Sequence, residues 1–144
     1  MIAAVSYRAL IAVTVLFLSS CSGTSDEQKV RAVIAAAEAA IEKRDTSDAM
    51  QLIADNYRDD RGLDKTGLQN FLRAYLFTHP KIELVVHIDA IEIETPTRAR
   101  ATIGFALIGT EAGASLTGEL ETLTVEFQRL KDEWLVTRVD RLRS

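Results

Sequence analysis

The sequence predicts an α+β domain in which three N-terminal helices pack on a curved four-stranded antiparallel meander, forming a cone or roll. Between residues 26 and 79, apolar residues recur at the helical period of about 3.6 residues. From Ile82 onward the period shortens to about two, which is typical of strands. Because the helical segments all precede the strands, the order favours helices grouped on one face of an antiparallel sheet.

The first helix is expected from Asp26 to Arg44. Ser25 can cap its N terminus, and Gln28 three residues later completes a capping-box pattern. One side of this helix carries small apolar residues, so it can lie close to the sheet that it covers. These residues are Val30, Val33, Ile34, Ala37 and Ile41.

Two more helices are expected before the sheet. The second runs from about Ser47 to Asn56, with Tyr57 following it on its apolar side. The third begins after Asp64, which can cap it, and carries an apolar stripe. It should end at His79, because the residue before a proline is disfavoured in the helical conformation.

The first strand shows a change of phase. Apolar residues alternate from Ile82 to Ile88 and then continue from Ile91 on the opposite parity. A slip of one residue within a strand predicts a β-bulge. Thr95-Pro96 indicates a turn, and the second strand is expected over residues 99–107.

Two further strands complete the predicted meander. Residues 111–116 should connect the second strand to a third, which spans residues 123–127. Lys131-Asp132 predicts a tight hairpin turn, and the fourth strand runs from Glu133 towards Leu142.

The N-terminal segment predicts export. Arg8 precedes an apolar run over residues 9–18, about half of the roughly 20 apolar residues that a membrane-spanning helix needs. The next residues complete Leu18-Ser19-Ser20-Cys21, which resembles the bacterial lipobox. That resemblance implies a lipoprotein signal peptide over residues 1–20, a lipid attached to Cys21, and a short tether over residues 21–25.

The lipobox also implies a location. Ser22 after the cysteine is typical of transfer to the periplasmic face of the outer membrane in a Gram-negative cell. Cys21 is the only cysteine in the chain, and acylation would remove an otherwise free thiol from an oxidising compartment. An ordinary cleaved signal followed by soluble export is the alternative.

Composition limits the partners of the remaining chain. The net charge of the full sequence is −4, and no basic stripe or polybasic segment is present. Nucleic-acid binding is therefore not expected, and attraction to anionic lipids is not expected either. Residues 26–143 are long enough for one domain with its own core.

Two segments carry a resemblance to a known fold family. The element order, with NYRDDRGLDKTGL between the second and third helices and DEWLVTRVDRL at the end, resembles the nuclear-transport-factor-2-like superfamily, which includes SnoaL-like cyclases and ketosteroid isomerases. The resemblance covers residues 26–143 and implies a cystatin-like α+β cone. It also implies that a homodimer formed through the sheet is possible.

Three residues are candidates for contact with a ligand inside the cone. Tyr57 and Tyr75 combine an apolar ring with a hydroxyl group, and simple core packing is the alternative for both. Arg138 shares the parity of Trp134 and Val136, which would direct it inward, where it would need an acidic partner.

No metal site or cofactor is expected. The acidic residues between positions 55 and 64 do not match a calcium-binding loop, and His79 and His87 share no ligand spacing. No phosphate-binding, dinucleotide-binding or nucleophile-elbow motif occurs.

These patterns favour a non-catalytic domain that binds a small apolar or amphipathic ligand. Docking of a protein partner on the outer face of the sheet, around Val85, Ala106 and Ile108, is the other non-catalytic possibility. The enzymatic alternative is an isomerase or cyclase that uses a cavity carboxylate. It has less support, because the first helix contains no tyrosine and Asp89 should face solvent.

Overall fold

The computed structural model describes residues 23–110 and 120–142. The predicted signal segment, the lipid-attachment residue Cys21 and the connection at residues 111–116 therefore lie outside the described residues. No helix within the described ranges is long and apolar enough to cross a membrane.

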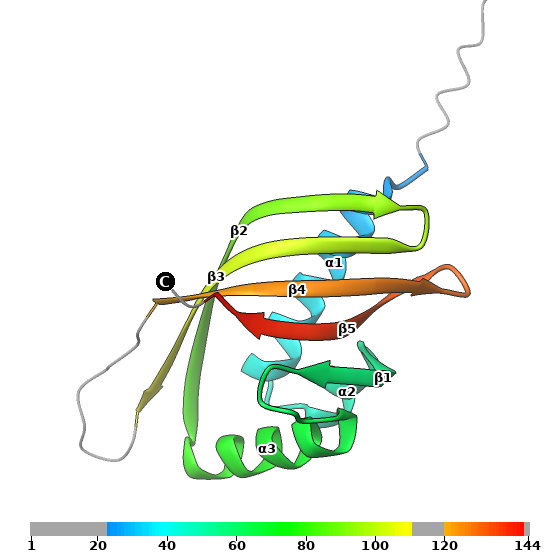
Figure 1. Cartoon of the computed structure of the whole chain (residues 1–144). Helices are drawn as coiled ribbons and strands as arrows, with labels where there is room; N and C mark the ends of the chain where they lie inside the picture. Colours follow the sequence, from blue (N-terminus) through cyan, green and yellow to red (C-terminus); the bar gives the residue numbers. More distant parts are fainter. Residues whose placement is uncertain (1–22, 111–119, 143–144) are drawn as a thin grey trace, which may run out of the picture.

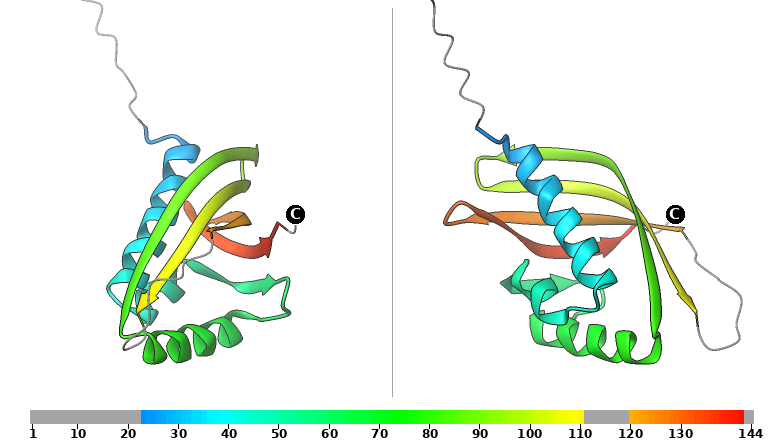
Figure 2. Two further views of the ribbon diagram at one scale, coloured as in Figure 1. Left: turned by 90° about the vertical axis from the view of Figure 1, so that its left-hand side faces the viewer. Right: turned by 180° about the vertical axis from the view of Figure 1, so that it is seen from behind.

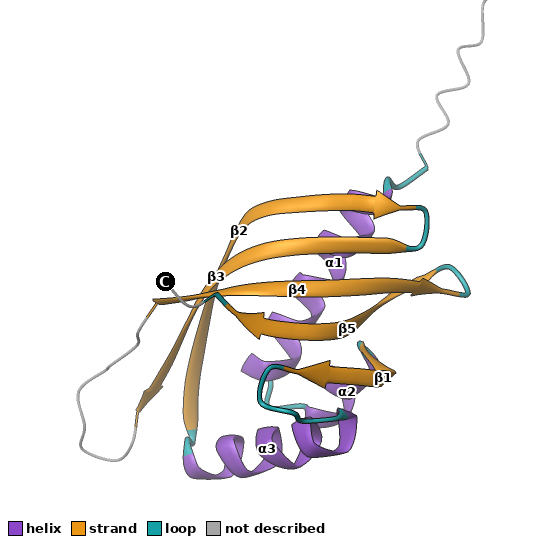
Figure 3. Ribbon diagram, in the orientation of Figure 1, coloured by secondary structure: helices purple, strands orange, loops and turns teal. Residues whose placement is uncertain are grey.

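Three helices and five strands make up the described part of the chain (Figure 1 and Figure 3). In order they are α1 (Asp26–Glu42), α2 (Thr46–Gln51), β1 (Ile53–Asp59), α3 (Lys65–Thr78), β2 (Lys81–Thr95), β3 (Arg98–Thr110), β4 (Leu120–Leu130) and β5 (Glu133–Arg141).

The strands form one curved sheet with helices on its inner side. The strand order is β1-β5-β4-β3-β2; β1 runs parallel to β5, and the other neighbours are antiparallel. Helix α1 crosses the inner face of the sheet, while α3 lies beyond β1 near the start of β2 (Figure 2). The prediction of an α+β fold with helices on a curved sheet is confirmed.

The prediction of a purely antiparallel, four-stranded sheet was wrong. The second helix ends at Gln51, and residues 53–59 form the fifth strand β1. The sequence predicts helix for residues 53–56 and the loop after it for residues 57–59. The N–H of Val136 donates to the carbonyl oxygen of Leu52 at 2.9 Å, and Ile53 then pairs with Val136. Because the edge of β5 offers unpaired backbone groups, tertiary pairing overrides the weak local helical pattern.

The starts of the first and third helices agree with the sequence, whereas α2 begins one residue before Ser47 and is capped by Asp45. The N–H of Gln28 donates to Ser25 Oγ at 3.2 Å, and the N–H of Ser25 donates to Gln28 Oε1 at 3.0 Å, which completes the capping box of α1. Asp64 Oδ1 accepts from the N–H of Gly67 at 2.8 Å and so caps α3. Helix α1 ends two residues earlier than expected, at Glu42.

The predicted irregularities of the sheet are also present. The register between β2 and β3 shifts between Ile88 and Ala90, as the change of phase indicated. Lys131 and Asp132 have φ values of 48° and 68°, which fit the two-residue hairpin turn between β4 and β5.

The main core lies between α1 and the inner face of the sheet. Val30 of α1, Tyr57 of β1 and Phe127 of β4 are its most completely buried large side chains. A smaller cluster of Ala40, Ala49 and Met50 joins α1 to α2. These contacts fix α1 on the sheet and leave space between the sheet and α3.

Candidate functional site

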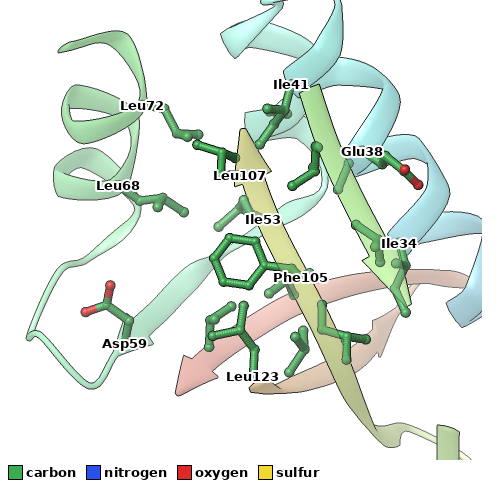
Figure 4. A pocket seen from close by; sticks show the side chains of 18 of the residues that line it. Ile34, Glu38, Ile41, Ile53, Asp59, Leu68, Leu72, Phe105, Leu107 and Leu123 are labelled. Carbon is green, nitrogen blue, oxygen red and sulfur yellow. The ribbon is translucent and has the colours of Figure 1, made fainter. Parts of the chain in front are cut away.

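A cavity of about 470 Å³ lies between the sheet, α1 and α3. Its walls are mainly aliphatic and aromatic (Figure 4). The apolar lining comes from α1 (Val33, Ile34, Ala37, Ile41), α2 (Ala49, Met50), α3 (Leu68, Phe71, Leu72, Tyr75, Leu76) and the sheet (Ile53, Tyr57, Leu84, Val86, Ile103, Phe105, Leu107, Leu123, Val125, Phe127, Val136, Val139). The volume and lining are typical of sites for small ligands.

One end of the cavity is polar. Strand β1 is parallel to β5, and β4 is antiparallel to β5. The last residues of β1 and β5 therefore lie beside the first residues of β4. This arrangement brings together five charged residues, which we call the polar end: Asp59, Asp60, Arg61, Glu121 and Arg141.

Asp59 organises the loop after β1. Its side chain is 2% exposed, and Oδ1 accepts from the N–H groups of Arg61 at 2.9 Å and Leu63 at 2.8 Å. Oδ2 accepts from Arg61 Nε at 3.3 Å and Nη2 at 3.1 Å. The guanidinium of Arg61 also lies over the ring of Phe71, 4.6 Å from its centroid. Asp59 therefore holds the loop against α3, and both of its oxygens are occupied.

The other three charged groups connect β1 to β5 and β4. The N–H of Arg141 donates to Asp60 Oδ2 at 3.1 Å. Arg141 Nε lies 3.4 Å from Glu121 Oε2 and forms an ion pair with it. Oε2 is shielded from solvent and accepts no hydrogen bond from any described residue.

Tyr57 and Tyr75 both line the cavity. Tyr57 is almost completely buried; burial, followed by the negative charge of Asp59, raises the pKa of its hydroxyl. Tyr75 is half-buried on α3, and burial raises the pKa of its hydroxyl also. Its ring stacks on that of His79, with 4.1 Å between the centroids. Both phenols are therefore neutral at physiological pH.

The third candidate, Arg138, does not line the cavity. The register between β4 and β5 shifts where Phe127 pairs with Val136 and Glu126 pairs with Arg138. This bulge reverses the alternation, so that Val139 and Arg141 line the cavity instead. Arg138 Nε donates to Asp140 Oδ2 at 2.5 Å, and this hydrogen bond and the charge of Asp140 raise the pKa of the guanidinium.

Sequence reasoning missed the polar end. Glu121 could have been found, because it has the parity of Leu123 and Val125 on the predicted third strand. Arg61 and Arg141 gave no comparable signal, since a charged loop and a charged strand end are usually solvated.

The described residues offer no group of three histidine, cysteine, aspartate or glutamate side chains that could hold a metal ion. His87 is exposed on β2, where its Nε2 lies 3.4 Å from Asp89 Oδ1. Both side chains are away from the cavity lining.

No model of a known protein family matches the sequence, and no curated protein matches it. Solved structures do match. A candidate scytalone dehydratase from Novosphingobium aromaticivorans DSM 12444 has a TM-score of 0.74 at 8% identity, covering 81% of this chain and 83% of that one.

Two further structures have no known function. A cystatin-like domain from Nostoc punctiforme PCC 73102 has a TM-score of 0.69 at 12% identity, with 85% of this chain and 80% of that one covered. An NTF-2 like protein from Shewanella oneidensis MR-1 has a TM-score of 0.61 at 18% identity, with 78% and 95% covered. At these identities the likeness shows that the chain has the NTF2-like, cystatin-like α+β fold.

Proposed function

We propose that this protein is an exported, lipid-anchored protein whose cone binds a small apolar or amphipathic ligand without transforming it. The observation that carries the proposal is the cavity of about 470 Å³, apolar along its walls and charged at one end. An apolar ligand gains about 25 cal/mol for each Å² of apolar surface that it buries there. A few polar groups at one end can fix its orientation.

The open cavity favours ligand binding over docking of a protein partner. A docking module would be expected to fill its interior and to present an apolar surface outside. Val85, on the outer face, is 45% exposed and pairs with Ala106, so an apolar outer surface is present as well. Space inside the cone is the feature that docking alone does not require.

Catalysis by a cavity carboxylate has less support. An isomerase or cyclase needs a carboxylate that is free to accept a proton from the substrate. Asp59 accepts four hydrogen bonds within the protein, which occupy both oxygens. Glu121 Oε2 is ion-paired with Arg141, and no described residue that could act as a second acid–base group hydrogen-bonds this oxygen. Holding a ligand is the simpler role for this carboxylate.

The position of the cavity suits an anchored protein. The lipid would be attached at Cys21, five residues before α1 begins at Asp26. The α1 residues that line the cavity, from Val33 to Ile41, lie towards the other end of this helix. A helix rises about 1.5 Å per residue, so α1 would hold the cavity roughly 10–20 Å beyond the tether.

Filling the cavity tests ligand binding. We expect the apolar fluorophore N-phenyl-1-naphthylamine to bind the purified protein and Leu123→Trp to weaken binding at least about tenfold, because the indole occupies the cavity. Val85→Trp adds the same group to the outer face and should leave binding unchanged. Equal binding by both variants, or no binding by the unmodified protein, would contradict the proposal.

A further inference from the structure

One carboxylate that lines the cavity has an oxygen that accepts no hydrogen bond within the described residues. Among the described residues, two shielded side-chain oxygens accept none, Glu121 Oε2 and Asp140 Oδ1. Of these two residues, only Glu121 lines the cavity. Oε2 has only an ion pair, with Arg141 Nε at 3.4 Å, while the Glu121 side chain as a whole is 35% exposed. The carboxylate therefore keeps the capacity to accept a hydrogen bond from a molecule in the cavity.

Glu121 faces the cavity because of its register on β4. It shares the inward parity of Leu123 and Val125, and it pairs across the sheet with Phe105 of β3, which also lines the cavity. A molecule lying along these apolar side chains would therefore have one end beside the Glu121 carboxylate.

The neighbouring charges determine which end of an amphipathic molecule suits this position. Asp59 and Arg61 neutralise each other. Within the polar end, Asp60 and Glu121 are then opposed by Arg141, which is half-exposed, so solvent screening weakens its attraction. Arg138 also attracts Asp60, but its charge is balanced by its own partner Asp140. The remaining charge is negative, so a carboxylate head group would be repelled here.

Building on the proposed binding function, we infer that the ligand has an apolar body and a hydrogen-bond-donating head group, a hydroxyl or an ammonium, which donates to the carboxylate of Glu121. The apolar body lies between α3 and the inner face of the sheet. A hydroxyl supplies a hydrogen-bond donor, and an ammonium supplies both a donor and a compensating charge.

Three compounds that share one alkyl chain test this inference. Titration calorimetry of the purified protein with decanol, decylamine and decanoate keeps the apolar contribution constant. We expect decanol and decylamine to bind at least about tenfold more tightly than decanoate, as expected for a hydrogen bond to a charged group. Equal or tighter binding of decanoate would overturn the inference.

Substitution at Glu121 should reverse the preference. In Glu121→Gln the negative charge is lost, an amide donor appears and Arg141 loses its partner, so decanoate should bind about tenfold more tightly and decylamine about tenfold less tightly. Glu38→Gln is the matched control, since Glu38 also lines the cavity but lies on α1, away from the polar end. It should leave the order unchanged.

The outcomes separate the inference from the proposed function. If N-phenyl-1-naphthylamine binds but the three compounds show no preference, the cavity binds apolar molecules and the role of Glu121 is overturned. An equal effect of Glu121→Gln and Glu38→Gln would also overturn it. If neither the fluorophore nor any alkyl compound binds, the proposed function itself fails. Should Glu121→Gln not fold, the comparison of the three compounds on the unmodified protein still decides.

Discussion

At the scale of single residues, burial and hydrogen bonding distinguish Asp59 from Glu121. Asp59 is buried and accepts four hydrogen bonds, so its charge is compensated within the protein. Glu121 lines the same polar end, and its Oε2 accepts no hydrogen bond from the described residues and has only the ion pair with Arg141. These two carboxylates therefore differ in how completely the protein itself satisfies them.

Tyr57 should make stability fall at high pH. Its hydroxyl has a pKa raised above the usual value of about 10, mainly by burial, so the folded state holds the proton more tightly than the unfolded state. The contribution of this protonated hydroxyl to the free energy of unfolding is complete below about pH 10 and is lost as the pH rises further. We expect the free energy of unfolding, measured by urea titration, to fall less steeply above pH 10 in Tyr57→Phe.

The comparison of slopes isolates this residue. Tyr75, whose pKa is also raised by burial, remains in both proteins, so its contribution cancels. Identical slopes for the two proteins would mean that Tyr57 titrates normally in the folded state.

At the scale of elements, the wall of the cavity formed by α3 is held at both ends. The loop after β1 contacts its first half through Arg61 and Phe71. At its C-terminal end, the guanidinium of Arg44 donates to the carbonyl oxygens of Leu76 and His79. Such bonds satisfy carbonyl groups that the end of a helix leaves without partners.

Removing Arg44 should loosen this wall. Arg44→Ala is expected to lower the free energy of unfolding by about 1–3 kcal/mol, because two carbonyl groups lose a charged donor. Amide hydrogen exchange in α3 should accelerate as well. Arg73→Ala removes an exposed arginine from the same helix. It should change the free energy of unfolding by no more than about 0.5 kcal/mol and leave amide exchange in α3 unchanged. Equal effects of the two substitutions would exclude a stabilising role for the hydrogen bonds of Arg44.

Element boundaries show what the sequence could and could not predict. The capping residues Ser25 and Asp64 and the bulge of β2 have local signals, and all three are present. Strand β1 depends on the free edge of β5, which no local pattern reports. The bulge of β5 lies between Val136 and Arg138, and it turns Arg138 away from the cavity. The only local signal for it is the odd spacing between the apolar residues Val136 and Val139.

At the scale of the whole molecule, the proposed function joins a lipid anchor to a hollow domain. The fold was predictable because the grouping of helices before strands restricts the architecture. The cavity was predictable only as an interior, with Tyr57 and Tyr75 beside it. Its polar end depends on β1 and β5 running parallel, which brings together Asp59 and Arg141 from distant parts of the chain.

The anchor makes a separate prediction. Cys21→Ser removes the residue that the lipobox resemblance identifies as acylated. We expect the unmodified protein to fractionate with membranes after a salt wash and the variant to remain unprocessed or become soluble. Mass spectrometry of the mature N terminus should find an acylated Cys21. An N terminus that still carries Met1 would exclude processing.

Methyl NMR with decanol tests most directly whether the cone binds a ligand inside. Leu68, Leu107 and Leu123 line the cavity, whereas Leu130 and Leu135 do not. Addition of decanol should shift the methyl signals of the first three and leave those of the other two in place, with intermolecular NOEs only to the cavity methyls. Shifts confined to Leu130 and Leu135, or no saturable shifts at all, would contradict binding within the cone.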